Sequence, residues 1–269
     1  MTDRKSAATD DARVCLLLGA GGRLGRNFCR YLGTRYRIAA VYRTAGDADA
    51  VRRQERVIDP LVPDRPPPEP RTYFYPIVAD LADPYSAKRV AELALAAFGH
   101  IDLVVNAAVH YDLGPGTSTE FLERLPYQLV INVVRPLQVA VEVYRQSWQA
   151  TPEENRRNRR NVINLSSVAA FNLYPDSGRL GYSACKAALT MASRHLASEL
   201  EPAGIRVNAL APNTFPGIVS VQQVLAALCD LDSGSTTGEV RVVDRDPTDS
   251  IRREETKKKG DSAPCRTGP

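Results

Sequence analysis

Short apolar runs alternate with longer amphipathic stretches along most of this chain, and no other feature limits the possible folds as strongly. Continuous apolar strands separated by helices are typical of a parallel sheet that is covered on both faces. Right-handed crossovers then build a doubly wound sheet with its ligand crevice at the carboxyl ends of the strands. We therefore predict an α/β fold with a doubly wound parallel sheet of about seven strands and helices on both faces. The expected strands are Arg13–Leu18, Arg37–Tyr42, Tyr73–Val78, Ile101–Asn106, Asn161–Leu165, Ile205–Leu210 and Glu239–Val243, and the expected helices are Leu24–Leu32, Ser86–Phe98, Glu120–Trp148, Tyr182–Leu200 and Val219–Cys229.

The length of 269 residues fits a single domain of this kind, which we expect over residues 12–246. The polar segments 1–11 and 247–269 are expected to be disordered. Residues 59–70 carry six prolines and are expected to form a surface excursion between the second and third strands.

Composition excludes several classes of function. The net charge of +4 is spread along the chain, which does not indicate nucleic-acid binding. The start of the chain is polar and acidic, and no apolar run approaches about eighteen residues, so we expect neither secretion nor a membrane span. The five cysteines form no CxxC pair, so we expect no metal site, and we expect free thiols in the reducing cytoplasm.

A glycine-rich turn follows the first strand, with glycines at 19, 22 and 25 and with Arg23 and Leu24 between them. Glycines let the backbone turn tightly and approach a pyrophosphate, whose charge is met by the N-terminus of the next helix. The alternative is a glycine-rich turn that binds nothing. The place of the glycine turn, directly after the first strand of a β/α alternation, favours dinucleotide binding in a Rossmann-like fold.

The end of the second strand bears on the choice between NAD and NADP. An NAD site needs an acidic residue there, whereas an NADP site needs cationic groups for the 2′-phosphate. The segment from Val41 to Thr44 has no carboxylate, and Arg43 with Arg23 could clamp the phosphate. We predict NADP(H), with the alternative that both are ordinary surface arginines.

Tyr182 and Lys186 stand four residues apart at the start of a predicted helix, so they share one face. A lysine ammonium beside a phenol favours the phenolate and lowers the tyrosine pKa, which suits a general acid near neutral pH. The pair alone is a weak signal. Ser166 and Ser167, which close the preceding strand, strengthen it.

These motifs together resemble the short-chain dehydrogenase/reductase family, in its compact single-domain branch, over roughly residues 13–243. The matching segments, in family order, are the glycine turn, Asp80-Leu81, Asn106-Ala107-Ala108, Asn132, Ser166-Ser167, Tyr182 with Lys186, and a segment that ends at Pro212-Asn213. The resemblance implies a catalytic tetrad of Asn132, Ser167, Tyr182 and Lys186. It also implies that Ser167 holds the substrate oxygen, that Tyr182 transfers its proton, that Lys186 lowers the tyrosine pKa and binds the nicotinamide ribose, and that Asn132 positions a water. The remaining cofactor contacts are expected at Arg43, Thr44, Asp80, Leu81, Asn106, Ala107, Ala108, Pro212, Asn213 and Phe215.

Two departures from the family pattern matter. Asn213 stands where the family has a glycine, which puts the nicotinamide-amide contacts in doubt. The segment after Pro212 is also too short for the family's helical lid, so we expect an open pocket. It could be covered by a bulky substrate, by the 112–119 loop or another subunit, or by a carrier- or protein-bound substrate. The alternative is that the short segment 215–217 is a sufficient cap.

The expected function is therefore an NADPH-dependent oxidoreductase that reduces a carbonyl or imine of a small-molecule substrate and forms a homodimer or homotetramer. Two alternatives stay open. One is a sensor or scaffold that binds NADP(H) without turnover, and the other is a dehydratase or epimerase on the same fold.

Overall fold

The computed structural model describes residues 12–47, 74–175 and 177–245, so the expected tails and the proline-rich excursion at 59–70 lie outside the described residues. Seven parallel strands form one sheet in the order β3-β2-β1-β4-β5-β6-β7. This confirms the predicted doubly wound sheet, with boundaries shifted by one or two residues in most strands. The strands are β1 (Val14–Leu18), β2 (Arg37–Tyr42), β3 (Phe74–Val78), β4 (Leu103–Asn106), β5 (Asn161–Leu165), β6 (Arg206–Pro212) and β7 (Val240–Val243).

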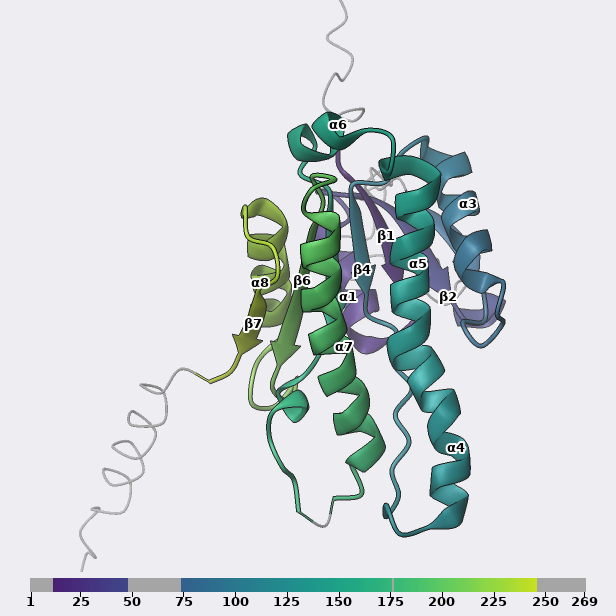
Figure 1. Cartoon of the computed structure of the whole chain (residues 1–269), viewed down its shortest axis with the longest axis vertical. Helices are drawn as coiled ribbons and strands as arrows, with labels where there is room; N and C mark the ends of the chain where they lie inside the picture. The colour runs from purple at the N-terminus through teal and green to yellow at the C-terminus, as the bar shows by residue number, and fades with distance from the viewer. Residues whose placement is uncertain (1–11, 48–73, 176, 246–269) are drawn as a thin grey trace, which may run out of the picture.

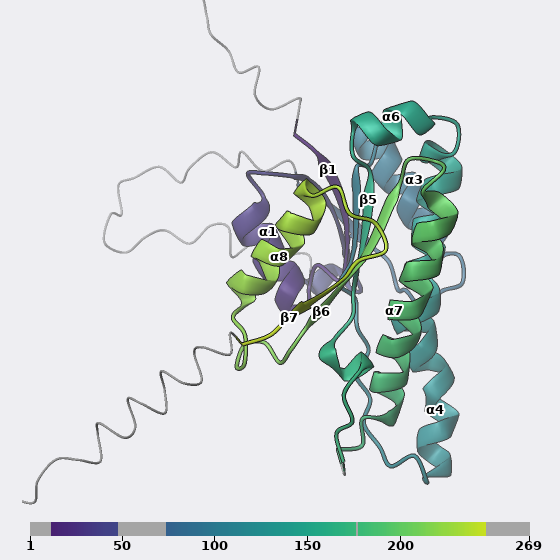
Figure 2. The same cartoon turned by 60° about the vertical axis from the view of Figure 1, so that its left-hand side comes forward.

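Helices cover both faces of the sheet, and Figure 2 shows the two layers from the side. On one face, α1 and α8 bury their apolar residues against the sheet around Phe28 and Leu228. On the other face, α3, α5 and α7 do the same around Val90, Val139 and Leu200. The helices are α1 (Arg23–Leu32), α3 (Ser86–Phe98), α4 (Thr119–Leu129), α5 (Arg135–Val143), α6 (Pro152–Arg157), α7 (Leu180–Leu200) and α8 (Val221–Ser233), of which the short α6 was not expected.

The helix predicted over Glu120–Trp148 is confirmed as one helical segment over 119–148, but two π-helical turns interrupt its α-helical hydrogen-bond pattern. Pro136 has no backbone N–H to donate to the carbonyl of Asn132 four residues earlier, so a regular α-helical ladder cannot run through this point. The segment consists of α4, the π-helical turn η1 (Val130–Val134), α5 and a second π-helical turn, η2 (Tyr144–Trp148). Asn132 therefore lies in a π-helical turn within this segment.

The strand order reverses between β1 and β4, and their carboxyl ends form the crevice in which such sheets bind ligands. Gly19 directly follows β1 at one side of this crevice and has a φ of +78°. A Cβ there would lie 2.6 Å from the backbone of Ala108, which follows β4, so glycine is required. The lower ends of α4 and α7 extend past this edge of the sheet (Figure 1). Within the described residues, no helix has the length and apolar character needed to cross a membrane.

Candidate active site

Two serines at the end of β5 have different surroundings. Ser166 is buried, and its hydroxyl lies 2.5 Å from that of Thr190 and donates to the Lys186 carbonyl at 3.2 Å. Ser167 is half-buried, and its hydroxyl accepts from the Ala169 N–H at 3.2 Å and donates to the Pro212 carbonyl at 3.5 Å. It also lies close enough to the Tyr182 phenol to lower its pKa. Because Ser166 is bound to α7, Ser167 is the hydroxyl that faces the predicted proton donor. A short 3-10 helix, η3 (Val168–Ala170), which was not expected, follows directly.

Lys186 lies one helical turn after Tyr182, below its ring. The side chain is 3% exposed, its Nζ donates to the Leu165 carbonyl at 2.6 Å, and Nζ lies 5.7 Å from the centroid of the tyrosine ring. Burial lowers the pKa of Lys186 to about 8, because the charged ammonium is separated from water.

The sequence predicts a lowered Tyr182 pKa, and the structure shifts this pKa in the opposite direction. Burial raises the pKa of the phenol, and this outweighs the lowering by the Ser167 hydroxyl and by the charge of Arg179. Lys186 does not lower the Tyr182 pKa as expected, because its ammonium is itself buried and lies against the ring face and the Leu165 carbonyl. A phenol with a raised pKa is protonated at neutral pH and can donate a proton.

The side-chain amide of Asn132 is bound to backbone, and its expected role in positioning a water stays a prediction. Its Nδ2 donates to the carbonyl of His110 at 2.7 Å, and its Oδ1 accepts from the His110 N–H at 2.9 Å. Asn132 is 1% exposed. The structure therefore gives this side chain the role of fixing the loop between β4 and α4.

The same loop carries an aromatic residue that the sequence interpretation missed. Gln128, one turn before Asn132, donates to the carbonyl of Asp112 at 3.3 Å, so the loop is held on both sides of Tyr111. The Tyr111 ring then packs edge-on against Tyr182, with centroids 4.7 Å apart. The sequence did contain a signal for Tyr111, because an aromatic residue shortly after the carboxyl end of a central strand lies where such sheets bind ligands.

The three glycines of the first turn have different roles. A Cβ at Gly25 would lie 2.3 Å from the Gly19 carbonyl oxygen, so Gly25 lets α1 approach the turn closely. Gly22 is the N-cap of α1, and no side chain caps this end of the helix. The unpaired N–H groups of a helix start suit a phosphate, so the turn fits a dinucleotide. Leu24 is buried in the core, which leaves only its backbone for such a contact.

The two arginines predicted to clamp the 2′-phosphate are not brought together. Arg23 donates to the Phe215 carbonyl at 3.2 Å, in the connection between β6 and α8. Because β6 lies on the other side of β1 from β2, this contact turns Arg23 away from the end of β2. Arg43 follows β2, is exposed and forms no ion pair within the described part of the chain.

A carboxylate that the sequence interpretation discounted lies beside the glycine turn. A Cβ at Gly21 would be 3.4 Å from the Cβ of Asp47, so this aspartate packs against the turn. Its carboxylate accepts from the Thr44 hydroxyl at 2.9 Å and lies 3.9 Å from Arg26. The segment from Val41 to Thr44 has no carboxylate, but the chain folds back after β2 and brings Asp47 to the glycine turn.

The expected adenine segment is held by a buried arginine. Asp80 is exposed, and its Oδ1 accepts from the Ala82 N–H at 2.9 Å. Arg135, which is 4% exposed, donates to the Leu81 carbonyl at 2.6 Å and to the Pro84 carbonyl at 3.3 Å. Because Arg135 directly follows η1, it ties the adenine segment to the turn that contains Asn132.

The other predicted cofactor residues fall into two groups. Asn106 is buried and donates to the Asn164 Oδ1 at 2.5 Å, so its side chain joins β4 to β5, while Ala107 and Ala108 are half-buried at the crevice. Asn213 donates to Asp244 at 2.9 Å and thereby fixes the start of the β6–α8 connection. Pro212 ends β6, and Phe215 packs against the core formed by α1 and α8.

In the described residues 213–220, no long helical segment follows β6, where the family has its lid. The β6–α8 connection is short, since β6 ends at Pro212 and α8 begins at Val221. The loops 107–118 and 171–179 are joined by a hydrogen bond from the Gly114 N–H to the Gly178 carbonyl at 3.0 Å.

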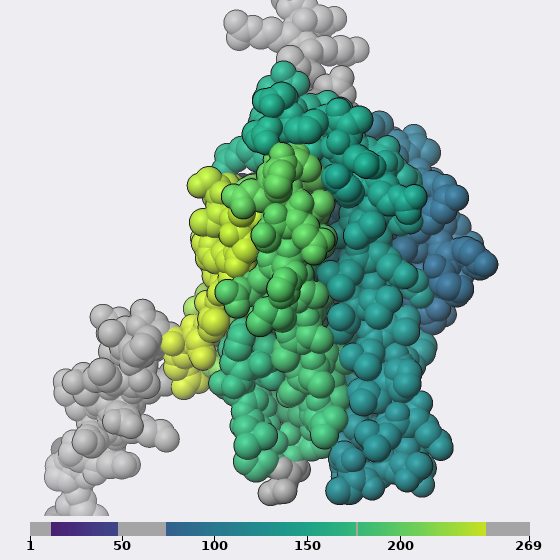
Figure 3. Space-filling view, viewed as in Figure 1, coloured from purple at the N-terminus to yellow at the C-terminus, as the bar shows by residue number. Residues whose placement is uncertain are grey.

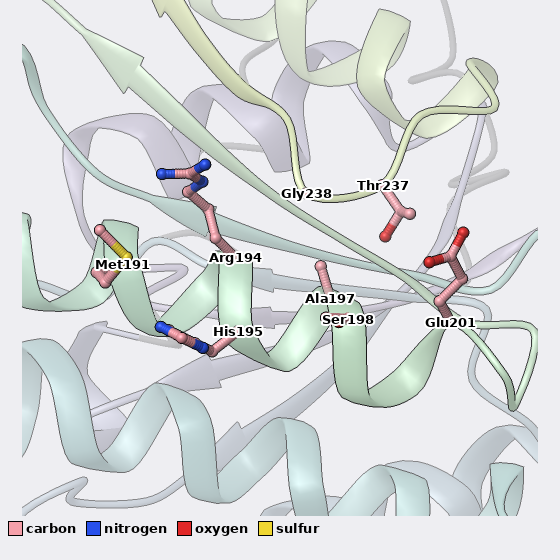
Figure 4. A pocket seen from close by; sticks show the side chains of 8 residues that line it. All are labelled: Met191, Arg194, His195, Ala197, Ser198, Glu201, Thr237 and Gly238. Carbon is pink, nitrogen blue, oxygen red and sulfur yellow. The ribbon is translucent and has the colours of Figure 1, made fainter.

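Two surface grooves lie away from these residues. One, of about 380 Å³, is lined by the outer face of α7 and by Thr237 and Gly238 (Figure 4). The other, of about 470 Å³, shares Arg194 and Gly238 with it and includes residues of β7. None of the four predicted catalytic residues lines either groove. Within the described residues, no group of three or more His, Cys, Asp or Glu could hold a metal ion.

The arrangement of a glycine turn, a serine at the end of β5 and a Tyr-Lys pair on α7 agrees with a comparison against family models. The model for short chain dehydrogenases matches residues 13–223. The chain belongs to the short-chain dehydrogenase/reductase family. Members of this family are oxidoreductases that bind a nicotinamide cofactor, which fits the crevice between β1 and β4.

Individual relatives in this family agree with that assignment. A pig protein, "Carbonyl reductase [NADPH] 2", is 30% identical over 200 residues, which cover 73% of this chain and 69% of the pig protein. Human "3-hydroxyacyl-CoA dehydrogenase type-2" is 32% identical over 143 residues, or 51% of this chain and 53% of the human protein. A solved short-chain dehydrogenase/reductase from Mycobacterium marinum shares the fold, with a TM-score of 0.73 at 18% identity over 86% of this chain and 93% of that chain.

Proposed function

We propose that this protein reduces a carbonyl or imine of an organic substrate by hydride transfer from NADPH, with Tyr182 as general acid. The observation that carries the proposal is the Tyr182–Lys186 pair on α7, in which the buried Nζ lies 5.7 Å from the centroid of the tyrosine ring. Ser167 at the end of β5 is near enough to the phenol to affect its pKa. When bound, NADPH supplies the hydride, and the protein supplies orientation and charge.

Each residue of this group has a task that follows from its surroundings. Ser167 holds the substrate oxygen, because its hydroxyl faces the Tyr182 phenol. Tyr182 is protonated at neutral pH and donates its proton to that oxygen. Below its pKa of about 8, Lys186 is a cation beneath the ring and stabilises the phenolate that forms. Asn132 holds the loop that packs against Tyr182.

NADPH is the proposed cofactor because exposed Arg43 follows β2, and because the related pig protein is named as an NADPH enzyme. The uncapped start of α1 would hold the pyrophosphate, and Asp80 and Leu81 would contact the adenine. Asp47 opposes a 2′-phosphate, but Arg26 and Thr44 already interact with its carboxylate.

We also propose that the protein acts as a homodimer or homotetramer in the cytoplasm. Exposed apolar residues on α4, η1 and α5 support association. Four cysteines within the described residues are free thiols, which agrees with a reducing compartment.

Turnover is tested by incubating the protein with NADPH and a panel of ketones, aldehydes and imines while following the nicotinamide absorbance. We expect NADPH oxidation by the wild type and none by Tyr182→Phe, with NADPH affinity nearly intact in that variant. Full activity in Tyr182→Phe would exclude it as the acid. Tight NADPH binding without oxidation of any panel member would favour the sensor or scaffold.

A further inference from the structure

Arg179 lies at the mouth of the site, three residues before Tyr182. It is the N-cap residue of α7, it is half-buried, and its guanidinium carbon lies 4.7 Å from the centroid of the Tyr174 ring. Arg179 and Tyr174 both act electrostatically on the Tyr182 phenol, which places them on the side of the proton donor that faces the loops.

Among the residues that the structure describes, Arg179 has no side-chain hydrogen-bond acceptor. A guanidinium that stacks on an aromatic face leaves its N–H groups, which lie in its plane, available for a carboxylate. Within residues 12–47, 74–175 and 177–245, Arg179 forms no ion pair and its side chain donates no hydrogen bond. By contrast, the side chains of Arg160 and Arg206 donate to Glu154 at 2.6 Å and to the Leu231 carbonyl at 2.8 Å.

Exposed apolar side chains lie on the segments around Arg179. Tyr111, Leu113 and Leu180 are 48%, 45% and 51% exposed. The hydrogen bond between Gly114 and Gly178 joins the loops that carry the first two residues and Arg179. Exposed aromatic and aliphatic side chains at the mouth of a site are typical of contacts with a ligand.

We propose that Arg179 binds a carboxylate on the substrate, so that the enzyme prefers carbonyl compounds with an apolar body and an anionic end. The proposal rests on the proposed function, because it places the reacting carbonyl at Tyr182 and Ser167. The apolar body then lies against Tyr111 and Leu113, and the carboxylate reaches the N–H groups of Arg179.

The test compares two substrates with the same body, 4-acetylbenzoate and its neutral methyl ester, with NADPH. We expect the wild type to have the higher kcat/KM for the acid. In Arg179→Met the ratio of kcat/KM for acid to ester should fall by about ten- to a hundredfold, as expected for loss of a charged hydrogen-bonding partner. Arg179→Glu should invert the ratio. A change in the Tyr182 pKa affects both substrates alike and cancels in the ratio.

The matched control is Arg194→Met, an exposed arginine on the outer face of the same helix, which should keep the wild-type ratio. An unchanged ratio in Arg179→Met, or no preference for the acid in the wild type, overturns the proposal while reduction of the ester leaves the proposed function intact. If neither ketone is reduced, calorimetric titration of 4-acetylbenzoate into the NADP-loaded protein shows whether Arg179 binds the carboxylate. Equal affinity in the wild type and in Arg179→Met overturns the proposal.

Discussion

Tyr111 and Tyr182 form an edge-to-face aromatic pair with ring centroids 4.7 Å apart. The pair exists because Asn132 binds both backbone groups of His110, which precedes Tyr111. The orientation of the proposed proton donor therefore depends on a loop that another helix segment holds in place.

Tyr111→Ala should lower kcat for carbonyl reduction by about three- to tenfold, because an aromatic pair contributes about 0.5–1.5 kcal/mol beyond its burial. Tyr111→Phe keeps the ring and should retain most of the activity. Steady-state kinetics with NADPH and one panel ketone measure both. Equal losses in the two variants would show that the hydroxyl of Tyr111 matters more than its ring.

Lys186→Met should abolish turnover and still stabilise the protein at pH 7. Burial lowers the lysine pKa from its ordinary value near 10.5 to about 8, so the unfolded chain binds more protons than the folded one between these values. The free-energy cost of burying the charged ammonium is therefore complete below about pH 8, and it disappears as the pH rises toward 10.5. Removing the charge should raise the free energy of unfolding by about 3 kcal/mol at pH 7. Urea denaturation at pH 7 and pH 10 measures this, and an equal gain at both pH values would contradict it.

The sequence was sufficient to predict the sheet, because buried parallel strands are continuous apolar runs and need no partner to be recognised. It also predicted that Ser167, Tyr182 and Lys186 lie together, since each stands at a strand end or on one helical face. Contacts made by long side chains across the fold could not be predicted in this way. Arg135 reaches the adenine segment more than fifty residues away, and no local pattern marks such a partner.

The π-helical turn at Val130–Val134 shows a different limit. Apolar periodicity runs through this segment and correctly indicates a helix, whereas a missing N–H at Pro136 decides where the α-helical hydrogen-bond pattern changes. Asp47 shows a third limit, because the backbone folds back after β2 and brings an acid three residues beyond Thr44 to the glycine turn.

Arg43→Asp should abolish or invert the preference for NADPH over NADH, because it replaces the cation that follows β2 with an acid. Asp47→Asn should act in the opposite direction and raise the NADPH preference several-fold, since it removes a negative charge near the expected 2′-phosphate. Fluorescence titrations with both cofactors give the ratio of dissociation constants. An unchanged ratio in Arg43→Asp would remove this residue from the cofactor site.

The last prediction concerns association through the face that α4, α5 and α7 share (Figure 3). Tyr127, Val134 and Val141 repeat every seven residues along α4, η1 and α5, and they are 41%, 41% and 37% exposed. We call these three residues the stripe, and exposed apolar residues in a row along one helical segment support packing against another helix.

Light scattering of the wild type at micromolar concentration should therefore show a dimer or tetramer. The double variant Val134→Lys, Val141→Lys should be monomeric, because two charges on the stripe would have to be buried in the interface without partners. Leu93→Lys is the control, since Leu93 is a similarly exposed apolar residue on α3, outside the stripe. A wild type that stays monomeric would exclude this interface, and an oligomeric double variant would place the interface elsewhere on the molecule.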